Sequence, residues 1–401
     1  MKNFIALALL LCIFCISSSR AQKPATEPFI KAGRQTATTN SRVASSQSIT
    51  TIPFELYDNL IYLPVRVNAS KPLWFILDSG ASGCVIDQTQ AKLLGLKTEG
   101  KAKGTGAGAG TYDLTFAKNV IFKLSVIETQ IESSYVIDLS SNLSVEGREA
   151  NGILGYDFFN RYVVLIDYDA MILRLYDPQT YNYSGRGEII PFTFKRKLPH
   201  ITAKFKVAGH EPADRDFLID TGSADAVDDD LIAQASSPKL ETVGGVGLGQ
   251  EFKTVLGRAE WLKLGSFTIE NTLGVSGGTA LIGGEVLHRF TVIFDYSRQQ
   301  MILEPNRHFR DEFVSGASGA DLRLVPESKI FRVHSVRKDS PAAEAGLREG
   351  DLIMAIDGSP TAEFNLDQAQ RMFAQDGREY LLSVKRGSEP LQVKIKSRKL
   401  L

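Results

Sequence analysis

The chain contains the same seven-residue pattern twice: residues 75–81 read FILDSGA and residues 217–223 read FLIDTGS. Each copy is an apolar run, typical of a buried strand, that ends in an acid, a hydroxyl residue and a glycine. A carboxylate at the end of a buried strand is costly unless it is hydrogen-bonded or used chemically. The duplication therefore predicts two halves, each of which supplies one acid to a shared site where the two carboxylates share a proton.

Downstream of each acid the repeat continues with two apolar residues and a glycine, at Gly155 and Gly283. An arginine follows each glycine by six residues, at Arg161 and Arg289. The acids are 142 residues apart and the glycines 128 apart, so the copies differ by an insertion of 14 residues. A difference of this size is typical of loop variation on a duplicated unit.

Residues from about 51 to 308 contain many short runs of Val, Ile, Leu, Phe and Tyr, separated by Gly, Asn and Asp. This pattern predicts a mostly-β region in two halves, residues 51–185 and 186–308. Strands are expected over 61–67, 73–77, 120–126 and 162–167. A short helix is expected over 87–94.

The N-terminus has the pattern of a secretion signal. Lys2 precedes a 13-residue apolar run, and Ser19 and Ala21 are the small residues that a signal peptidase reads. We predict a signal peptide over 1–21, a flexible linker over 22–50, and an exported protein, periplasmic or extracellular, with no membrane span after cleavage. A retained N-terminal anchor is the alternative, although the run is short for a span of about 20 residues.

Composition bears on several other functions. The formal net charge is zero, so nothing indicates nucleic acid as a partner. Cleavage after Ala21 leaves Cys84 as the sole cysteine, which we expect to be a packed apolar residue. The five histidines lack metal-ligand spacing, so we expect neither a metal nor a cofactor.

Two further motifs have plain structural interpretations. Residues 274–278 read GVSGG and match the serine-hydrolase elbow by letter, but the following residues do not predict the helix that this motif requires. We interpret the match as a coincidence. The acidic run 228–230 has the residue types of a calcium site, but a solvated helix start is the preferred interpretation.

Residues 315–401 differ in texture and predict a compact α+β domain. Ser340 is suited to cap a short helix that has Pro341 in its first turn and Gly346 as its stop. Strands are expected at 331–336, 381–385 and 391–395. A second helix is expected at 367–373.

The two halves resemble the lobes of the aspartic peptidase superfamily, which includes pepsin and the retroviral proteases. The resemblance implies two retropepsin-like β-barrel lobes related by a pseudo-twofold axis, with Asp78 and Asp220 as the catalytic dyad. It implies that Ser79 and Thr221 hydrogen-bond across the lobes. It also implies that Gly80 and Gly222 let the two acid loops approach closely.

The two copies differ after the glycine, where the first has Ala81 and the second has Ser223. In pepsin-like lobes a hydroxyl at this position bonds the outer oxygen of the acid and favours its ionised form. We therefore predict that Asp78 is the more easily protonated acid and that activity extends toward mildly acidic or neutral pH. Glycine-rich residues 103–110 and 243–247 are candidate flaps, with plain surface loops as the equal alternative.

The C-terminal region resembles a PDZ domain of the kind attached to bacterial envelope proteases, on the segments 340–347, 350–353 and 357–358. The resemblance implies that a peptide binds beside a glycine-rich loop and adds a strand to the sheet. That loop is expected near Gly319, Ala320, Asp321 and Leu322. Asp321 places a negative charge there, which counts against binding of a C-terminal carboxylate. Three alternatives stay open: the domain binds peptide C-termini, binds internal segments, or packs on the lobes.

These patterns predict an exported aspartic endopeptidase that acts on peptides or proteins, with a PDZ domain for recognition. Both acids lie in one chain, so we expect a monomer. One alternative is a non-catalytic peptide-binding protein on a peptidase scaffold. The other is a peptidase that pairs its lobes across a dimer.

Overall fold

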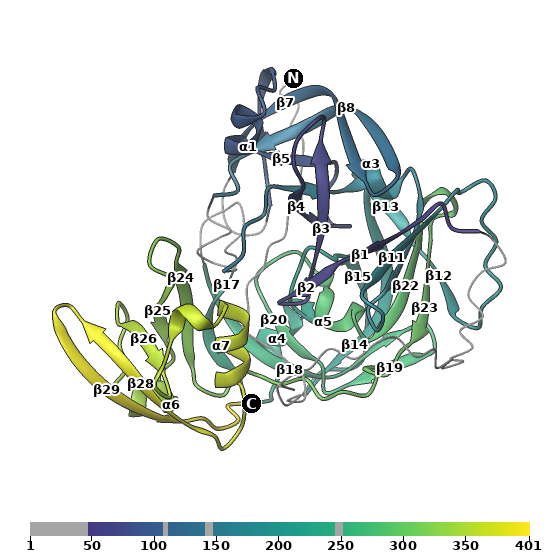
Figure 1. The fold of residues 1–401 in the computed structure, drawn as a ribbon. Coiled ribbons are helices and arrows are strands. Elements are labelled where there is room, and N and C mark those ends of the chain that lie inside the picture. Colours follow the sequence, from purple (N-terminus) through teal and green to yellow (C-terminus); the bar gives the residue numbers. More distant parts are fainter. Residues whose placement is uncertain (1–46, 107–110, 141–146, 245–251) are drawn as a thin grey trace, which may run out of the picture.

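The computed structural model describes residues 47–106, 111–140, 147–244 and 252–401 (Figure 1). The predicted signal peptide, residues 1–21, and nearly all of the predicted linker, residues 22–50, lie outside these ranges. No helix within them is long and apolar enough to cross a membrane. The predicted mostly-β fold is confirmed, since the described strands form four sheets and the helices are short.

The first half of the chain forms a barrel-like sheet of eight strands, here called the first barrel sheet, in the order β2-β3-β4-β9-β5-β8-β7-β6. An additional pairing of β3 with β7 curves it toward closure. Its strands are β2 (Glu55–Tyr57), β3 (Leu60–Val67), β4 (Leu73–Leu77), β5 (Val85–Asp87), β6 (Thr98–Gly104), β7 (Tyr112–Leu124), β8 (Ile127–Ile137) and β9 (Gly152–Leu154). Its helices are α1 (Gln88–Leu93) and α3 (Tyr156–Phe159). The predicted helix at 87–94 is therefore confirmed, and the Asp87 carboxylate caps it by accepting from the Gln90 amide at 2.9 Å.

The second half repeats this arrangement in a nine-stranded sheet, here called the second barrel sheet. Its order is β13-β14-β15-β21-β16-β20-β18-β17, with β19 on β18 and an additional β14–β18 pairing. Its strands are β13 (Thr193–Lys195), β14 (Leu198–Val207), β15 (Ala213–Ile219), β16 (Val227–Asp228), β17 (Leu240–Gly244), β18 (Phe252–Leu264), β19 (Phe267–Glu270), β20 (Leu273–Val275) and β21 (Leu281–Ile282). Its helices are α4 (Leu231–Gln234) and α5 (Gly284–Leu287). In each barrel sheet the acid-bearing strand, β4 or β15, runs parallel to a short strand of the repeat, β9 or β21.

A third sheet joins the two halves, and the sequence did not reveal it. Its order is β1-β11-β10-β22-β23-β12, so three strands come from the first half of the chain and three from the second (Figure 1). These strands are β1 (Thr50–Pro53), β10 (Val163–Asp167), β11 (Ile172–Tyr176), β12 (Glu188–Pro191), β22 (Phe290–Asp295) and β23 (Gln300–Pro305), and the 3-10 helix η1 (Tyr296–Arg298) connects the last two. The antiparallel pairing of β10 with β22 at the centre fixes how the two barrel sheets, and hence the two acid loops, face each other.

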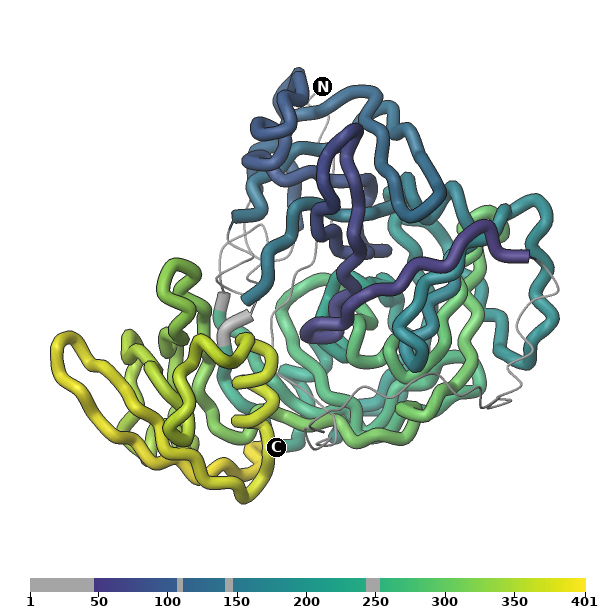
Figure 2. Tube along the Cα trace, in the orientation of Figure 1, coloured from purple at the N-terminus to yellow at the C-terminus, as the bar shows by residue number. Residues whose placement is uncertain are grey.

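The C-terminal region forms a separate sheet in the order β24-β25-β26-β28-β29, with β27 on β26. Its elements are β24 (Ala320–Val325), β25 (Ile330–Val336), α6 (Pro341–Glu344), β26 (Leu352–Ile356), β27 (Ser359–Pro360), η2 (Thr361–Glu363), α7 (Leu366–Phe373), β28 (Glu379–Arg386) and β29 (Glu389–Lys396). The predicted Ser340 cap is present, since its Oγ accepts from the Ala343 amide at 3.3 Å. The region has its own apolar core and lies at one side of the molecule, with α7 turned toward the rest (Figure 2).

Candidate active site

The two acids occupy equivalent positions at the ends of buried strands. Asp78 follows β4 and Asp220 follows β15, and their side chains are 1% and 0% exposed. Each acid's amide donates to the repeated apolar segment beside it: Asp78 to the Leu154 carbonyl and Asp220 to the Ile282 carbonyl, both at 3.0 Å. The segments that precede Gly155 and Gly283 in the sequence therefore hold the two acid loops in place.

Hydroxyl groups on the residues after the acids lock the two loops together. Ser79 Oγ donates to the Ile219 carbonyl at 2.7 Å and accepts from the Thr221 amide at 3.0 Å. Reciprocally, Thr221 Oγ1 donates to the Leu77 carbonyl at 2.8 Å and accepts from the Ser79 amide at 3.0 Å. These four buried hydrogen bonds make each loop depend on the other for satisfied backbone groups.

The glycines bring the two carboxyl groups together. Gly80 and Gly222 donate their amides to Oδ1 of Asp78 and Asp220, at 2.7 and 2.8 Å. A methyl group on Gly80 would lie 2.5 Å from Asp220 Cγ, and one on Gly222 would lie 2.3 Å from Asp78 Cγ. Each carboxyl group therefore packs against the glycine of the opposite loop, and no side chain could replace either glycine without moving an acid.

The environment favours a single proton shared by Asp78 and Asp220. Burial raises the pKa of Asp78 well above its ordinary value of 3.8, and the charge of Asp220 and a hydrogen bond to it raise that pKa further. Burial also raises the pKa of Asp220, but the Gly222 amide and the hydrogen bond from Asp78 oppose this rise. That Asp78 is the more easily protonated of the two acids stays a prediction.

The predicted cause of this inequality is wrong, however. Ser223 Oγ accepts from the Asp225 amide at 3.3 Å, and the described hydrogen bonds include none from Ser223 to Asp220. Asp220 Oδ2 is buried with no donor among the described residues. The Ser223 hydroxyl instead closes its own turn. The Gly222 amide first, and then Asp78, oppose the rise in the pKa of Asp220, and Ser223 does not.

Two tyrosines flank the acid pair, and sequence reasoning selected neither. Tyr112 begins β7; burial and then the charges of Tyr135 and Asp78 raise its pKa. Tyr296 is fully buried, its hydroxyl has no partner among the described residues, and its pKa is raised by burial and by both acids. The available signals were weak: Tyr112 follows the glycine-rich candidate flap, and Tyr296 ends the second copy of the repeat.

The two candidate flaps are only partly described. In the first, residues 103–106 are described, with Gly104 at the end of β6, while residues 107–110 lie outside the described ranges. A methyl group on Gly104 would lie 2.4 Å from the ring of Tyr112, which places this tyrosine at the base of the first candidate flap. In the second, Val243 and Gly244 end β17 and residues 245–247 are outside the described ranges.

The alternative nucleophiles do not assemble a site. Cys84 is buried, and burial first, then the charge of Asp157, raises its pKa to about 12, as suits the predicted packed residue. Ser276 follows β20, and the chain continues into the strand β21 with no helix between them. The interpretation of the GVSGG match as a coincidence is therefore confirmed.

The acidic run 228–230 does begin a helix, but its first two residues are buried and not solvated. Asp229 Oδ1 accepts from the Leu231 amide at 2.9 Å, and Oδ2 pairs with Arg215 Nε at 2.7 Å. Asp228 is less well satisfied, because the donor to its Oδ1 is the Gly278 amide at the longer distance of 3.4 Å. Burial, aided by the charges of Asp230 and Asp229, raises the pKa of Asp228 to about 7.

We expect Asp228→Asn to stabilise the protein increasingly as pH rises from about 4 to 7, and fully above that range. A folded pKa raised above the ordinary value means that the folded state binds the extra proton, so stability falls as pH rises through the interval from about 4 to 7. The asparagine variant lacks this loss, with an advantage of up to about 4 kcal/mol at pH 8. Urea unfolding of the variant and of wild type at pH 4 and pH 8 measures this advantage. An equal difference in unfolding free energy at both pH values would show that Asp228 is not buried in its charged form.

The predicted ligand loop of the C-terminal region is corrected by the structure. Only Gly319 precedes β24, whereas Ala320, Asp321 and Leu322 lie in that strand and pair with β25. The reason is that Leu322, 1% exposed, enters the core and fixes the strand, while Asp321 is partly buried and accepts from Arg323 Nη2 at 3.4 Å. β24 is the edge strand of this sheet and lies beside α7.

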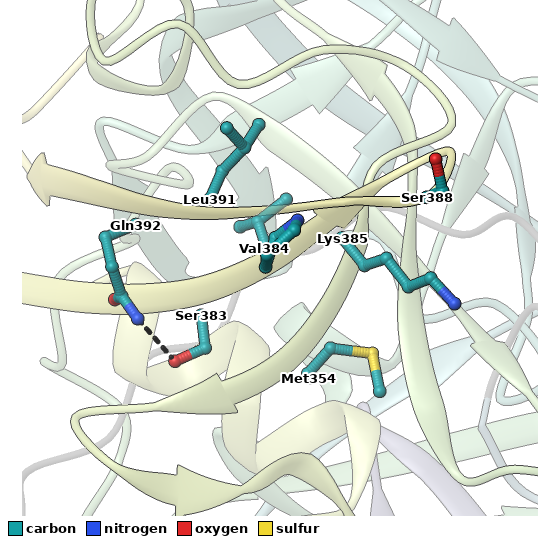
Figure 3. A pocket seen from close by; sticks show the side chains of 8 residues that line it. Met354, Ser383, Val384, Lys385, Ser388, Leu391 and Gln392 are labelled. Atoms are coloured by element: carbon teal, nitrogen blue, oxygen red, sulfur yellow. Dashed lines mark hydrogen bonds between the residues drawn. The ribbon is translucent and has the colours of Figure 1, made fainter.

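A groove lies on the C-terminal region, between β26, β28 and β29 (Figure 3). This groove has a volume of about 390 Å³ and is lined by Met354, Leu391 and Lys385 among others. Gln392 Nε2 donates to Ser383 Oγ at 3.2 Å across two of its strands. Its lining carries no acid, so the acid pair described above remains the stronger candidate for chemistry.

Comparison with known proteins agrees with this geometry. Residues 63–158, which include Asp78 and its supporting glycine segment, match the family model "Aspartyl protease". Residues 332–386 match the model "PDZ domain". The chain carries an aspartyl protease-like domain and a C-terminal PDZ domain. The sequence predicted both from short motifs.

One curated relative also has a protease name. A "Probable CtpA-like serine protease" of Staphylococcus haemolyticus is 27% identical over 103 residues, which is 25% of this chain. The match spans about a fifth (21%) of that relative's length. The relative's name and the matched family model differ in catalytic type.

Proposed function

We propose that this protein is an aspartic endopeptidase in which Asp78 and Asp220 activate water between two lobes, residues 51–185 and 186–308. In this proposal the lobes are retropepsin-like and related by a pseudo-twofold axis. The observation that carries it is the reciprocal hydroxyl lock of Ser79 and Thr221, with each carboxyl group against the opposite glycine. Two buried turn aspartates with purely structural roles would not need this mutual arrangement.

The mechanism follows from the unequal acids. Asp78 enters the cycle protonated and Asp220 ionised. Asp220 takes a proton from a water molecule, whose oxygen attacks the peptide carbonyl carbon, while Asp78 donates its proton to the carbonyl oxygen. The tetrahedral species then collapses: the C–N bond breaks, the leaving nitrogen takes a proton from Asp220, and Asp78 recovers its own. No acyl-enzyme is formed.

A serine peptidase is the second candidate, because the curated relative is named as one. This route requires a serine beside a base that can take its proton. The elbow-like serine, Ser276, instead receives its backbone contacts from Thr254: the Thr254 hydroxyl donates to the Ser276 carbonyl, and the Ser276 amide donates to Thr254 Oγ1 at 3.3 Å. The geometry of the acid pair therefore favours the aspartic mechanism.

The partners and location follow from the same proposal. The substrate is a peptide or protein, and the PDZ domain is expected to bind a peptide. Both acids belong to one chain, which favours a monomer over a dimer with crossed lobes. Export to the periplasm or the cell exterior rests on the signal-like N-terminus. A peptide-binding protein without turnover is the remaining alternative.

We expect kcat/KM to be higher at about pH 6 than at about pH 3. The raised pKa of Asp220 means that this base is protonated, and the site inactive, at pH values near the ordinary carboxyl value of 3.8. Activity should fall again at high pH, when Asp78 ionises. A pH–rate profile on one peptide measures both limbs. A maximum near pH 3 would contradict the proposed environment of the pair.

The test of the function is cleavage of a peptide library by the mature chain from about pH 3 to pH 8, followed by mass spectrometry. We expect cleavage that survives treatment with a serine-phosphonylating reagent. Loss of cleavage after that reagent would favour the serine candidate. No cleavage at any pH would favour the binding protein.

A further inference from the structure

The turn between β2 and β3, residues 57–60, contacts three parts of the molecule at once. On one side, the Tyr57 hydroxyl accepts a hydrogen bond from the Asp367 amide in the first turn of α7 at 3.1 Å. On the other side, the Asn59 side chain reaches the second barrel sheet. This turn is therefore where the PDZ domain, the first barrel sheet and the second barrel sheet meet.

Asn59 is bonded directly to the segment that follows Asp220. Its Nδ2 donates to the Ala224 carbonyl at 3.1 Å and to Glu285 Oε2 at 2.7 Å. Glu285 lies at the start of α5, where the Gly284 amide donates to the Ser223 carbonyl at 2.7 Å. One side chain of the first barrel sheet thus ties the Asp220 loop to the helix that supports it.

The PDZ side of the turn is closely fitted. A methyl group on Gly147 would lie 2.5 Å from Leu366 Cβ and 2.8 Å from the Tyr57 hydroxyl. Arg371 of α7 pairs with Asp367 and also faces the turn: burial lowers the pKa of Arg371, and the charges of Asp58 and Tyr57 oppose that change. The first turn of α7 cannot shift without disturbing Tyr57.

A second connection leads back to the PDZ domain from α5. Glu285 Oε1 accepts from Arg289 Nη2 at 3.2 Å, and both side chains are almost completely buried. The Arg289 guanidinium lies 3.7 Å from the ring centre of Phe313, in the segment that leads to the PDZ domain, and also donates to the Asp311 carbonyl. α5 is thereby held by the PDZ connection on one side and by Asn59 on the other.

We propose that Asn59 is a positioning residue for the Asp220 loop and that the PDZ helix α7 sets its position through Tyr57. This inference rests on the proposed peptidase function for its kinetic test. A displacement of α7, such as a peptide bound between β24 and α7 would cause, then changes turnover without any contact with the acids. The coupling acts on the placement of Asp220, so it changes kcat and leaves KM unaltered.

The test is a double-mutant cycle on the full chain with Tyr57→Phe and Asn59→Gly. Glycine accepts the left-handed backbone of position 59, where φ is 61°. The change therefore removes the two hydrogen bonds of the Asn59 side chain without straining the backbone. We expect Asn59→Gly to lower kcat about tenfold and Tyr57→Phe about threefold, and the double variant to match Asn59→Gly alone. Tyr162→Phe, which loses a hydroxyl bonded to Thr129 at 2.8 Å in the same barrel sheet, is the matched control and should keep wild-type kcat.

Hydrogen exchange gives a readout that does not depend on activity. Both Tyr57→Phe and Asn59→Gly should speed exchange of the amides at 223–225 by about threefold to tenfold, and Tyr162→Phe should not. If wild type cleaves nothing but exchange responds in this way, the coupling stands and the peptidase function fails. Additive kinetic effects, or unchanged exchange at 223–225 in both variants, would overturn the coupling.

Discussion

Replacing either acid with asparagine should abolish peptide cleavage and leave the fold intact. We expect kcat/KM to fall about 10²- to 10⁴-fold in both Asp78→Asn and Asp220→Asn, because each variant loses either the base for water or the acid for the carbonyl oxygen. The midpoint of thermal unfolding should not decrease, since burial raises the pKa of both carboxyls and the neutral amide avoids a buried charge. Cleavage kinetics and calorimetry measure the two effects.

The matched control for this experiment is Asp228→Asn. Asp228 is as buried as the acid pair and lies in the second barrel sheet. It takes part in neither the hydroxyl lock nor the contacts of Gly80 and Gly222 with the opposite acid. Its activity should stay within about threefold of wild type. An asparagine variant of Asp78 or Asp220 that cleaves as fast as this control would remove that acid from the mechanism.

Thr221→Val should strongly destabilise the protein, because it removes one half of the reciprocal hydroxyl lock. Valine keeps the shape of threonine but leaves the Ser79 amide and the Leu77 carbonyl buried without the hydroxyl that bonds them. Each such group costs about 1–3 kcal/mol, so the free energy of unfolding should fall by about 2–5 kcal/mol. Urea unfolding measures this loss at a pH where Asp78 and Asp220 have the same protonation in the variant and in wild type.

Thr221→Ser is the control for this second prediction, because it keeps the hydroxyl and loses one methyl group. It should retain the lock and most of the activity. A valine variant whose unfolding free energy lies within about 0.5 kcal/mol of wild type would show that water or a rearranged loop satisfies the two backbone groups. The lock would then not hold the acid loops together.

The sequence was sufficient to identify the acid pair, because the pattern around it is local. An apolar strand, an acid, a hydroxyl and a glycine within seven residues specify both the buried acid and the close approach of the loops. The duplicated segments before Gly155 and Gly283 also marked the repeat, and the structure places the short strands β9 and β21 there. The PDZ elements were likewise marked by helix caps and turns at fixed spacing.

Features that depend on distant partners could not be predicted from the sequence. Continuous apolar runs mark the strands β10 and β22 but do not show that they pair with each other to join the halves. Ser223 has the residue type for a bond to Asp220, but its turn directs the hydroxyl to the Asp225 amide. Arg161 and Arg289 look equivalent in the repeat, yet only Arg289 is buried, because the segment around Phe313 covers it.

The most direct test of the central claim is the binding of a peptide whose scissile bond is replaced by a hydroxyethylene group. This group mimics the tetrahedral species, and its hydroxyl fits between one neutral and one ionised carboxyl group. Calorimetry on wild type and on both asparagine variants should show binding at least about 10²-fold tighter to wild type, with cleavage of a library peptide inhibited in parallel. Equal binding to all three proteins, together with cleavage that the compound does not inhibit, would contradict an active site built on Asp78 and Asp220.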